Sequence, residues 1–386
     1  MTVQELQKAF FDAYGKKEDA IYCAPGRVNL IGEHTDYNGG PVFPCALSFA
    51  TYLLLRKNGS QEVNFCSLNE AKTFRVPLSE LTNLLEKGSW VNYPIAVFDQ
   101  FIQKGVQFTE GFDILIWGNV PLGAGLSSSA ALEVVTAFAL NDQMATGFDR
   151  VELAKMGRFA EHKVGVNCGI MDQFVSAHGK KDHAIFLNCD TLEFEAVPVK
   201  LEGVKVVISN THSPHKLGDE YNDRVRECQL ALQQLQTVRP GLKNLAELTQ
   251  AEFDEIESAI TDPIALKRAR HVVGEVQRTA DAVKELKAGN ISKFGQLMNA
   301  SHVSLRDDYE VTGKYLDALA EEAWKIDGVI GSRMTGGGFG GCTVSLVKDE
   351  AIDVFKEKVG AAYQVKTGLT ADFYIAEIGD GAKRLS

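Results

Sequence analysis

Two glycine-rich segments constrain this 386-residue chain more than any other feature, and about 200 residues separate them. Residues 121–133 read PLGAGLSSSAALE, and residues 334–342 read MTGGGFGGC. Glycine lets backbone amides turn toward a bound anion, because no Cβ stands in the way. The first segment runs into a helix-forming stretch, residues 130–140, and a helix N-terminus attracts phosphate through its free N–H groups and its dipole. The two segments therefore predict a polyphosphate site.

The kind of phosphate site can be narrowed by elimination. No segment carries the Gly-x-x-x-x-Gly-Lys-Ser/Thr pattern of a P-loop. Gly336, Gly338 and Gly341 satisfy Gly-x-Gly-x-x-Gly, but residues 342–347 after them are strand-like. A dinucleotide fingerprint leads from a strand into a helix, so this interpretation is disfavoured. Tight turns between packed elements remain an alternative, although they account less well for so many glycines.

Composition favours a two-domain enzyme of the cytoplasm. The length exceeds that of one ordinary domain, and 45% hydrophobic residues suffice for sizeable cores. A net charge of −11 disfavours nucleic acid as a partner. The chain shows neither an apolar run long enough for a membrane span nor a signal peptide, and nothing points to an obligate protein partner. Seven scattered cysteines without a Cys-x-x-Cys pair indicate a reducing compartment and no structural zinc.

Periodicity gives a coarse order of elements. Strands are expected at residues 21–30, 42–56, 112–117 and 204–209, and helices from the N-terminus to about residue 14 and at residues 149–162 and 170–178. Beyond residue 200 the pattern becomes mostly helical, which places a domain boundary there. One long helix is expected to begin at Asp262-Pro263 and to end at Gly289. Its apolar residues repeat at spacings of three and four and predict one buried stripe: Leu266, Ala269, Val273, Val276, Ala280 and Val283.

Residues 23–40 carry the densest polar chemistry in the chain. Within them lie five polar side chains close together, which are Arg27, Asn29, Glu33, His34 and Asp36. Two carboxylates, an imidazole and a guanidinium on a glycine-bracketed loop suit a polyhydroxyl ligand, because carboxylates accept from several hydroxyls. A loop made polar for solubility alone is an equally open alternative for this segment.

These three segments resemble the signature motifs of the GHMP small-molecule kinases. The first, residues 26–37, resembles the signature of the galactokinase family within that superfamily, and the match continues through residues 168–174, 219–222 and 301–310. The resemblance implies an α+β fold with two GHMP kinase domains, residues 1–200 and 201–386, and an active site in the cleft between the domains. It also implies ATP-dependent phosphorylation of galactose at its C1 hydroxyl, which gives galactose 1-phosphate.

The resemblance assigns the catalytic pair to Asp172 and Arg27. Asp172 lies at the start of an expected helix, where the dipole favours a charged carboxylate, and its implied role is the general base. Arg27 would keep Asp172 ionised and stabilise charge on the transferred phosphoryl group. A plain first-turn carboxylate and a surface salt bridge are the alternatives for these two residues.

Metal and nucleotide contacts are implied in the same way. Mg²⁺ would be held by Ser129 and Glu161, since this ion needs few protein ligands beside phosphate oxygens and water. Trp90 and Tyr93 would lie near adenine, with ordinary core aromatics as an equally open alternative. The phosphates of ATP would be wrapped by the first glycine-rich segment, at Gly123, Ala124, Gly125, Leu126, Ser127 and Ser128.

The resemblance also assigns sugar contacts and shows one departure. The residues implied to bind galactose are Glu33, His34, Thr35, Asp36, Gly169 and Tyr221. The segment from Glu161 to Asp172 is one residue shorter than the usual galactokinase pattern, which puts the metal role of Glu161 in question. We expect the loop at Gly165 to absorb the deletion.

Two other functions remain to be weighed. A galactose- and ATP-sensing homologue without turnover is disfavoured, because the serine-rich loop and Asp172 are intact. A GHMP kinase for another substrate, such as mevalonate, homoserine or N-acetylgalactosamine, is disfavoured by the first motif.

Overall fold

The N-terminal half is built on a six-stranded sheet in the computed structural model, which describes residues 1–121, 124–213 and 217–386. The strand order is β13-β1-β3-β6-β4-β5. Most neighbours are antiparallel, while β4 and β6 run parallel. The strands are β1 (Ala20–Asn29), β3 (Pro44–Lys57), β4 (Glu62–Ser67), β5 (Phe74–Pro77), β6 (Phe112–Gly118) and β13 (Lys383–Arg384).

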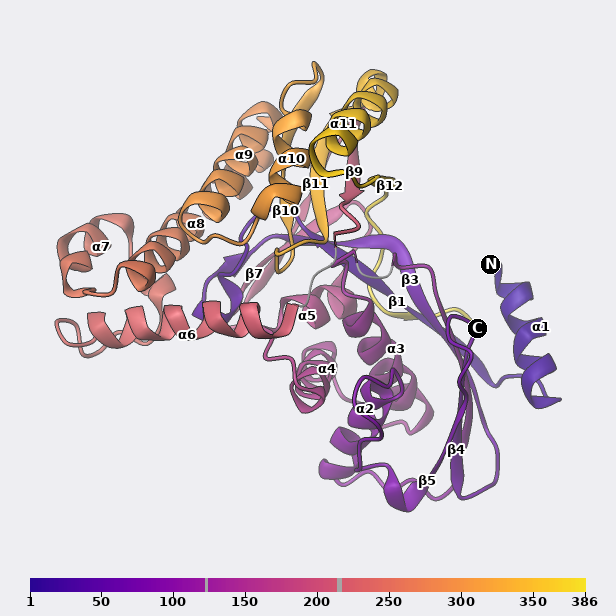
Figure 1. The fold of residues 1–386 in the computed structure, drawn as a ribbon. Coiled ribbons are helices and arrows are strands. Elements are labelled where there is room, and N and C mark those ends of the chain that lie inside the picture. Colours follow the sequence, from indigo (N-terminus) through magenta and orange to yellow (C-terminus); the bar gives the residue numbers. More distant parts are fainter. Residues whose placement is uncertain (122–123, 214–216) are drawn as a thin grey trace.

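Helices cover both faces of this sheet, as Figure 1 shows. On one face lies α1 (Val3–Tyr14), whose Leu6 and Phe10 pack on Leu54 of β3. The opposite face carries the larger core under four helices: α2 (Asn92–Gln103), α3 (Ser128–Gln143), α4 (Arg150–Val164) and α5 (Met171–His178). Local sequence starts two of these five helices, because Thr2 forms a capping box on α1 and the Asp149 carboxylate accepts from the Glu152 N–H on α4.

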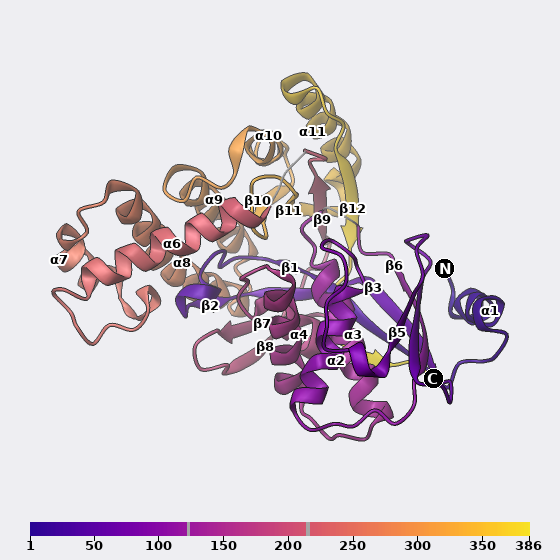
Figure 2. The same cartoon turned by 60° about the horizontal axis from the view of Figure 1, so that its bottom comes forward.

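The C-terminal half combines a four-stranded antiparallel sheet with long helices (Figure 2). The order is β10-β11-β9-β12, formed by β9 (Val204–Asn210), β10 (Val329–Thr335), β11 (Cys342–Lys348) and β12 (Asp372–Ala376). The helices are α6 (Leu217–Leu235), α7 (Gln250–Ile256), α8 (Pro263–Lys287), α9 (Ile291–Asp307), α10 (Gly313–Ala323) and α11 (Ile352–Thr367). In both views α6, α7 and α8 lie side by side and extend away from the sheets.

The two halves share a core, and the last strand of the chain returns to the first sheet. Val28 and Phe43 from the first half pack in one apolar cluster with Ile208 and Val344 from the second. A third sheet, β2-β7-β8, consists of β2 (Pro41–Val42), β7 (His183–Asn188) and β8 (Phe194–Pro198). After β12 the chain returns to the first sheet, where β13 pairs antiparallel with β1. A domain boundary near residue 200 stays a prediction. The last strand, β13, belongs to the sheet of the N-terminal half although it lies at the C-terminal end of the sequence.

Two expectations meet a clear outcome. The second glycine-rich segment joins β10 to β11 as an antiparallel hairpin, which excludes a Rossmann dinucleotide site there. The apolar stripe expected on α8 is wrong at Ala280, which is exposed. The buried face of the helix includes a side that carries polar residues instead. That face carries Arg268, His271, Glu275 and Thr279. No helix within the described ranges is long and apolar enough to cross a membrane.

Candidate active site

A pocket of about 280 Å³ lies where the end of β1, the N-termini of α3 and α5, and the β10–β11 hairpin meet. Most of the residues expected at the site line it: Arg27, Glu33, His34, Asp36, Gly125, Leu126, Ser127, Ser128, Ser129, Glu161, Gly169, Asp172 and Tyr221. Thr35, Ala124, Trp90 and Tyr93 do not line it, and Gly123 lies outside the described residues. The fold therefore collects side chains from both halves around one cavity.

The two glycine-rich segments lie against each other at this pocket. A Cβ added at Gly336 would stand 3.2 Å from the Gly125 carbonyl, and one at Gly341 would stand 3.5 Å from the Ala124 carbonyl. Ser127 has a left-handed backbone with φ 61°, and α3 begins directly after it at Ser128. Free N–H groups at this helix N-terminus point to where an anion is favoured. The polyphosphate site predicted from glycine content stays a prediction, and this arrangement is compatible with it.

Arg27 and Asp172 form a two-pronged ion pair beside this loop. Arg27 Nε and Nη2 each donate to one oxygen of Asp172 at 2.7 Å, and Arg27 Nη1 donates to the Gly125 carbonyl at 2.7 Å. The Ser127 hydroxyl also donates to Asp172. Burial opposes the charge on Arg27, yet Asp172 and Glu33 hold the pKa of Arg27 above its ordinary value. The Asp172 carboxylate is therefore oriented by three donors at the edge of the first glycine-rich segment (the phosphate loop, residues 124–128).

A second acidic group lies at the C-terminal end of α4. Burial raises the pKa of Glu161 to about 7, although hydrogen bonds with Glu133 and Ser129 lower it. Burial and then the charge of Glu161 raise the pKa of Glu133 well above its usual range. Gln173 Nε2 donates to Glu133 Oε2 at 2.9 Å and to Glu161 Oε2 at 3.3 Å. A carboxylate and a serine hydroxyl thus converge beside the phosphate loop.

The loop after β1, residues 30–40, which was expected to bind sugar (the sugar loop), presents His34 and Asp36 to the same pocket. His34 has a left-handed backbone with φ 61°, a strained conformation of the kind that clusters at functional sites. Burial raises the pKa of Asp36 to about 7, and the negative charge of Asp172 adds to this rise. A Cβ at Gly169 would stand 1.9 Å from Asp36 Oδ2, so only glycine fits opposite this carboxylate. Tyr221, from α6, completes the rim.

Two of the residues expected to bind sugar already have hydrogen-bond partners within the protein. Glu33 is 1% exposed, and its carboxylate accepts from Asn29 Nδ2 at 2.9 Å, Arg333 Nη1 at 3.2 Å and the Gly336 N–H at 2.8 Å. Thr35 is fully buried, and its hydroxyl bonds to the carbonyls of residues 32 and 41. Glu33 therefore ties the sugar loop to the second glycine-rich segment, and Thr35 closes the loop on itself.

The aromatic pair lies in a neighbouring pocket. Trp90 and Tyr93 line a cavity of about 300 Å³ that also reaches Ser128 and Ser129. Trp90 Nε1 is buried and lacks a hydrogen-bond partner among the described residues. Trp90 also packs against Phe65 and Phe74, so the core-aromatic alternative holds for part of its surface. The aromatic cavity therefore shares Ser128 and Ser129 with the pocket at the start of α3.

Sequence reasoning missed several residues that the fold brings to the site. Glu133 and Gln173 stand behind Glu161, and Tyr37 and Tyr309 stand behind His34. The first pair has no local sequence pattern, since a glutamate in a helix is ordinarily exposed. Glu133 lies on the same face of α3 as Ala130 and Ala137, and both alanines are buried. This spacing in the sequence could have indicated that Glu133 faces inward.

Comparison with known families agrees with this geometry. The model described as "Galactokinase galactose-binding signature" matches residues 8–57. The model "GHMP kinases N terminal domain" matches residues 92–180, and "GHMP kinases C terminal" matches residues 282–365. The three matches cover the sugar loop, the phosphate loop with Asp172, and the second glycine-rich segment in turn.

Individual proteins are similar over the whole chain. A galactokinase of Clostridium beijerinckii is 47% identical over 386 residues and covers 99% of each chain, and one of Fusobacterium nucleatum is 50% identical over 94% of each. The crystal structure of Lactococcus lactis galactokinase complexed with galactose superposes with a TM-score of 0.97 at 41% identity over 100% of both chains. Mevalonate kinase of Methanococcus jannaschii, at 18% identity and a TM-score of 0.67 over 93% of this chain and 98% of its own, shares the fold.

Proposed function

The chain belongs to the galactokinase family of GHMP kinases, whose reaction is the ATP-dependent phosphorylation of galactose, and we propose that Asp172 and Arg27 carry that reaction in the pocket described above. The single observation that supports these roles is the two-pronged ion pair between Arg27 and Asp172. It fixes a carboxylate beside the phosphate loop and across from the sugar loop. The transferred group and its acceptor would meet there.

In this mechanism Asp172 removes the proton of the C1 hydroxyl. A carboxylate is a weak base toward an alcohol, so the proton moves late, as the oxygen bonds to the γ-phosphorus and the hydroxyl becomes acidic. The bond from phosphorus to the bridging oxygen of ADP breaks, and galactose 1-phosphate and ADP result. Arg27 orients the Asp172 carboxylate before transfer and offsets negative charge on the phosphoryl oxygens during transfer.

The phosphate chain of ATP would lie along the loop at Gly125 to Ser128. Backbone N–H groups at the start of α3 supply fixed donors, so little reorganisation is needed as charge shifts toward ADP. The Ser127 hydroxyl, which donates to Asp172 in this structure, also borders this path. Adenine would enter the cavity of Trp90 and Tyr93, where Trp90 Nε1 offers a donor.

Mg²⁺ fits the residues that this site offers. Ser129 and Glu161 provide one hydroxyl and one carboxylate, and a buried Glu133 oxygen beside them has no hydrogen-bond partner in the described chain. Among the described residues no group of three or more acidic, histidine or cysteine side chains could hold a metal, which suits an ion held mainly by phosphate oxygens and water. When bound, Mg²⁺ neutralises phosphate charge during transfer.

Galactose would be held by the sugar loop and its neighbours. Asp36, in its charged form, accepts from ring hydroxyls, while His34 and Tyr221 line the same pocket. Glu33 and Thr35 support the loop from behind. Galactose and ATP are then the small-molecule partners, and the cytoplasm, where ATP is supplied and the seven free thiols stay reduced, is the proposed location.

The test is ADP release with ATP, Mg²⁺ and a panel of sugars and small alcohols. We expect galactose to react and glucose to react about tenfold to a hundredfold less, because its C4 hydroxyl leaves a buried polar group on the sugar loop unpaired. Equal turnover of the two sugars would overturn the galactose assignment. Binding of both ligands without turnover would identify a sensor, and reaction with N-acetylgalactosamine in preference to galactose would identify a related kinase.

A further inference from the structure

A chain of hydrogen bonds runs from His34 away from the pocket into the C-terminal half. His34 Nδ1 lies 2.8 Å from the Tyr37 hydroxyl, which lies 2.7 Å from the Tyr309 hydroxyl. The Tyr309 hydroxyl in turn lies 3.0 Å from Cys228 Sγ. His34 is 4% exposed and Tyr309 is fully buried, so water does not compete along most of this chain. His34 itself lines the pocket, and its other ring nitrogen, Nε2, is buried.

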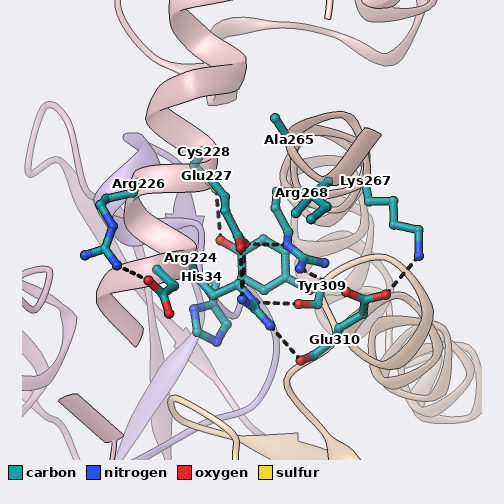
Figure 3. Close-up of polar contacts among 12 residues, drawn as sticks. His34, Arg224, Arg226, Glu227, Cys228, Ala265, Lys267, Arg268, Tyr309 and Glu310 are labelled. Carbon is teal, nitrogen blue, oxygen red and sulfur yellow. Dashed lines mark hydrogen bonds and ion pairs between the residues drawn. The ribbon is translucent and has the colours of Figure 1, made fainter. Parts of the chain in front are cut away.

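Tyr309 is held on every side, as Figure 3 shows for its arginine neighbours. Its ring packs against His34 with centroids 4.7 Å apart and against His271 at 4.4 Å. Arg224 Nε donates to the Tyr309 carbonyl at 2.8 Å. Arg268, 2% exposed, lies over the ring at 5.9 Å and donates to the carbonyl of residue 308 at 2.6 Å. The ring therefore has one position.

The two arginines are themselves locked together. Glu227 accepts from Arg224 Nη1 at 3.1 Å and from Arg268 Nε at 2.7 Å, and Glu310 accepts from Arg268 Nη2 at 2.9 Å (Figure 3). Glu310 has a left-handed backbone with φ 56°, and Arg224 Nη2 donates to its carbonyl at 2.9 Å. These contacts join α6, α8 and the loop before α10. They fix Tyr309 to the same helix, α6, that carries Tyr221 into the pocket.

Chemistry sets the direction of the hydrogen-bond chain. The imine nitrogen of a neutral histidine is the strongest acceptor present, and a phenol is a stronger donor than a thiol. The favoured order therefore has Tyr309 donating to Tyr37, and Tyr37 donating to His34 Nδ1. Nδ1 is then the acceptor, and the ring proton stays on Nε2.

We propose that Tyr37 and Tyr309 are positioning residues that hold His34 in the tautomer protonated on Nε2, so that it donates to one hydroxyl oxygen of galactose and sets sugar affinity. This inference rests on the proposed function, because it assigns galactose to the pocket. Neither tyrosine touches the reacting atoms. Their removal should therefore change the binding of sugar far more than the chemical step.

The test compares Tyr37→Phe and Tyr309→Phe in the full chain by steady-state ADP release. For Tyr37→Phe we expect the galactose KM to rise about tenfold, the equivalent of one hydrogen bond, with kcat and the KM for ATP within about threefold of wild type. For Tyr309→Phe, one bond further away, we expect a rise of about threefold. Tyr14→Phe is the matched control, since it removes a phenol hydroxyl that bonds to the Ile114 carbonyl at 2.8 Å on α1, far from the pocket.

Two readouts separate tautomer control from general loosening. In a panel of 2-, 3-, 4- and 6-deoxygalactose, the sugar that lacks the hydroxyl bound by His34 should bind weakly to wild type, and Tyr37→Phe should penalise it less than galactose. The ¹⁵N spectrum of the His34 ring, assigned with His34→Asn, should show protonation on Nε2 in wild type.

Three results would overturn the proposal. The first is an unchanged galactose KM in Tyr37→Phe, and the second is an equal loss for ATP and for every sugar, which would mark a structural role alone. The third is a ring protonated on Nδ1 in wild type. If wild type phosphorylates no galactose, the proposed function fails, and the ¹⁵N spectrum still decides the tautomer.

Discussion

Asp36→Asn should stabilise the sugar-free protein while it removes galactose binding. Burial, aided by the nearby charge of Asp172, raises the pKa of Asp36 from an ordinary 3.8 to about 7. Between these two values the folded chain keeps a proton at this site that the unfolded chain loses. The free energy of unfolding therefore falls as the pH rises through this window, and the full cost is present above pH 7. Asparagine cannot ionise, so the variant escapes that cost.

The size of the gain follows from the same pKa values. Since one pKa unit corresponds to about 1.4 kcal/mol, a rise from 3.8 to about 7 limits the gain at pH 8 to about 4 kcal/mol. The side chain borders the open pocket, where water screens its charge, so we expect about 2 to 4 kcal/mol. With about 2.1 cal/mol/K of unfolding entropy per residue over 386 residues, the melting temperature should rise by about 2 to 5 °C.

Thermal melts by circular dichroism at pH 5 and pH 8 measure this gain. At pH 5 the limit falls below about 2 kcal/mol, because the window above 3.8 is then shorter. Saturating galactose should raise the melting temperature of wild type but leave the variant unchanged. Asp113→Asn is the control for loss of a negative charge, since Asp113 accepts from Asn58, Asn64 and Arg56 and its substitution should destabilise the fold.

The reasoning on Asp36 fails if the variant is no more stable than wild type at pH 8. It fails equally if the gain stays constant between pH 8 and pH 5, because a steric cause would then replace the electrostatic one. A stabilised variant that still binds galactose would keep the pKa argument and remove Asp36 from the sugar site.

The remaining predictions concern the catalytic pair and the metal. Asp172→Asn should fold and bind both substrates but lose at least about a hundredfold in kcat, the low end for a general base; near-normal kcat would refute this role. Arg27→Lys should also lower kcat, because an ammonium cannot make the two parallel bonds to Asp172. Glu161→Gln should raise the Mg²⁺ concentration that gives half the maximal rate and leave the galactose KM nearly unchanged; an unaltered Mg²⁺ titration would exclude Glu161 as a ligand.

Local chemistry made much of the fold predictable. Asp149 and Asp262 cap α4 and α8 as expected, because a short carboxylate before a helix bonds the first free N–H groups wherever it occurs. Gly289 ends α8 with φ 78°, a backbone that glycine adopts without strain. The stripe on α8 failed at Ala280 because spacing fixes the period of a helix face but not which face a neighbouring domain covers.

The site was predictable only where the sequence motif itself carries the chemistry. Arg27 and Asp172 were paired through resemblance, and the structure brings them together. Glu33 differs, because its three donors include Arg333 and Gly336, about 300 residues away, and no local pattern shows that its carboxylate is already bound. Residues such as Tyr309 depend on the same long-range packing, which composition and periodicity do not encode.

The geometry of α4 and of the loop after it indicates where the residue missing between Glu161 and Asp172 was lost. A residue lost inside α4 would have turned Glu161 by about 100°, whereas one lost from a loop shortens its reach by at most about 3.3–3.6 Å. Helix α4 is unbroken to Val164, and Gly165 ends it with φ 113° while its N–H bonds to the Glu161 carbonyl at 3.1 Å. His162 Nε2 then donates to the Cys168 carbonyl at 2.8 Å and draws the shortened loop back over the helix end. Because Glu161 is 7% exposed and bonds to Ser129, we expect the loop to carry the deletion and the carboxylate to keep the orientation that the proposed metal ligand needs.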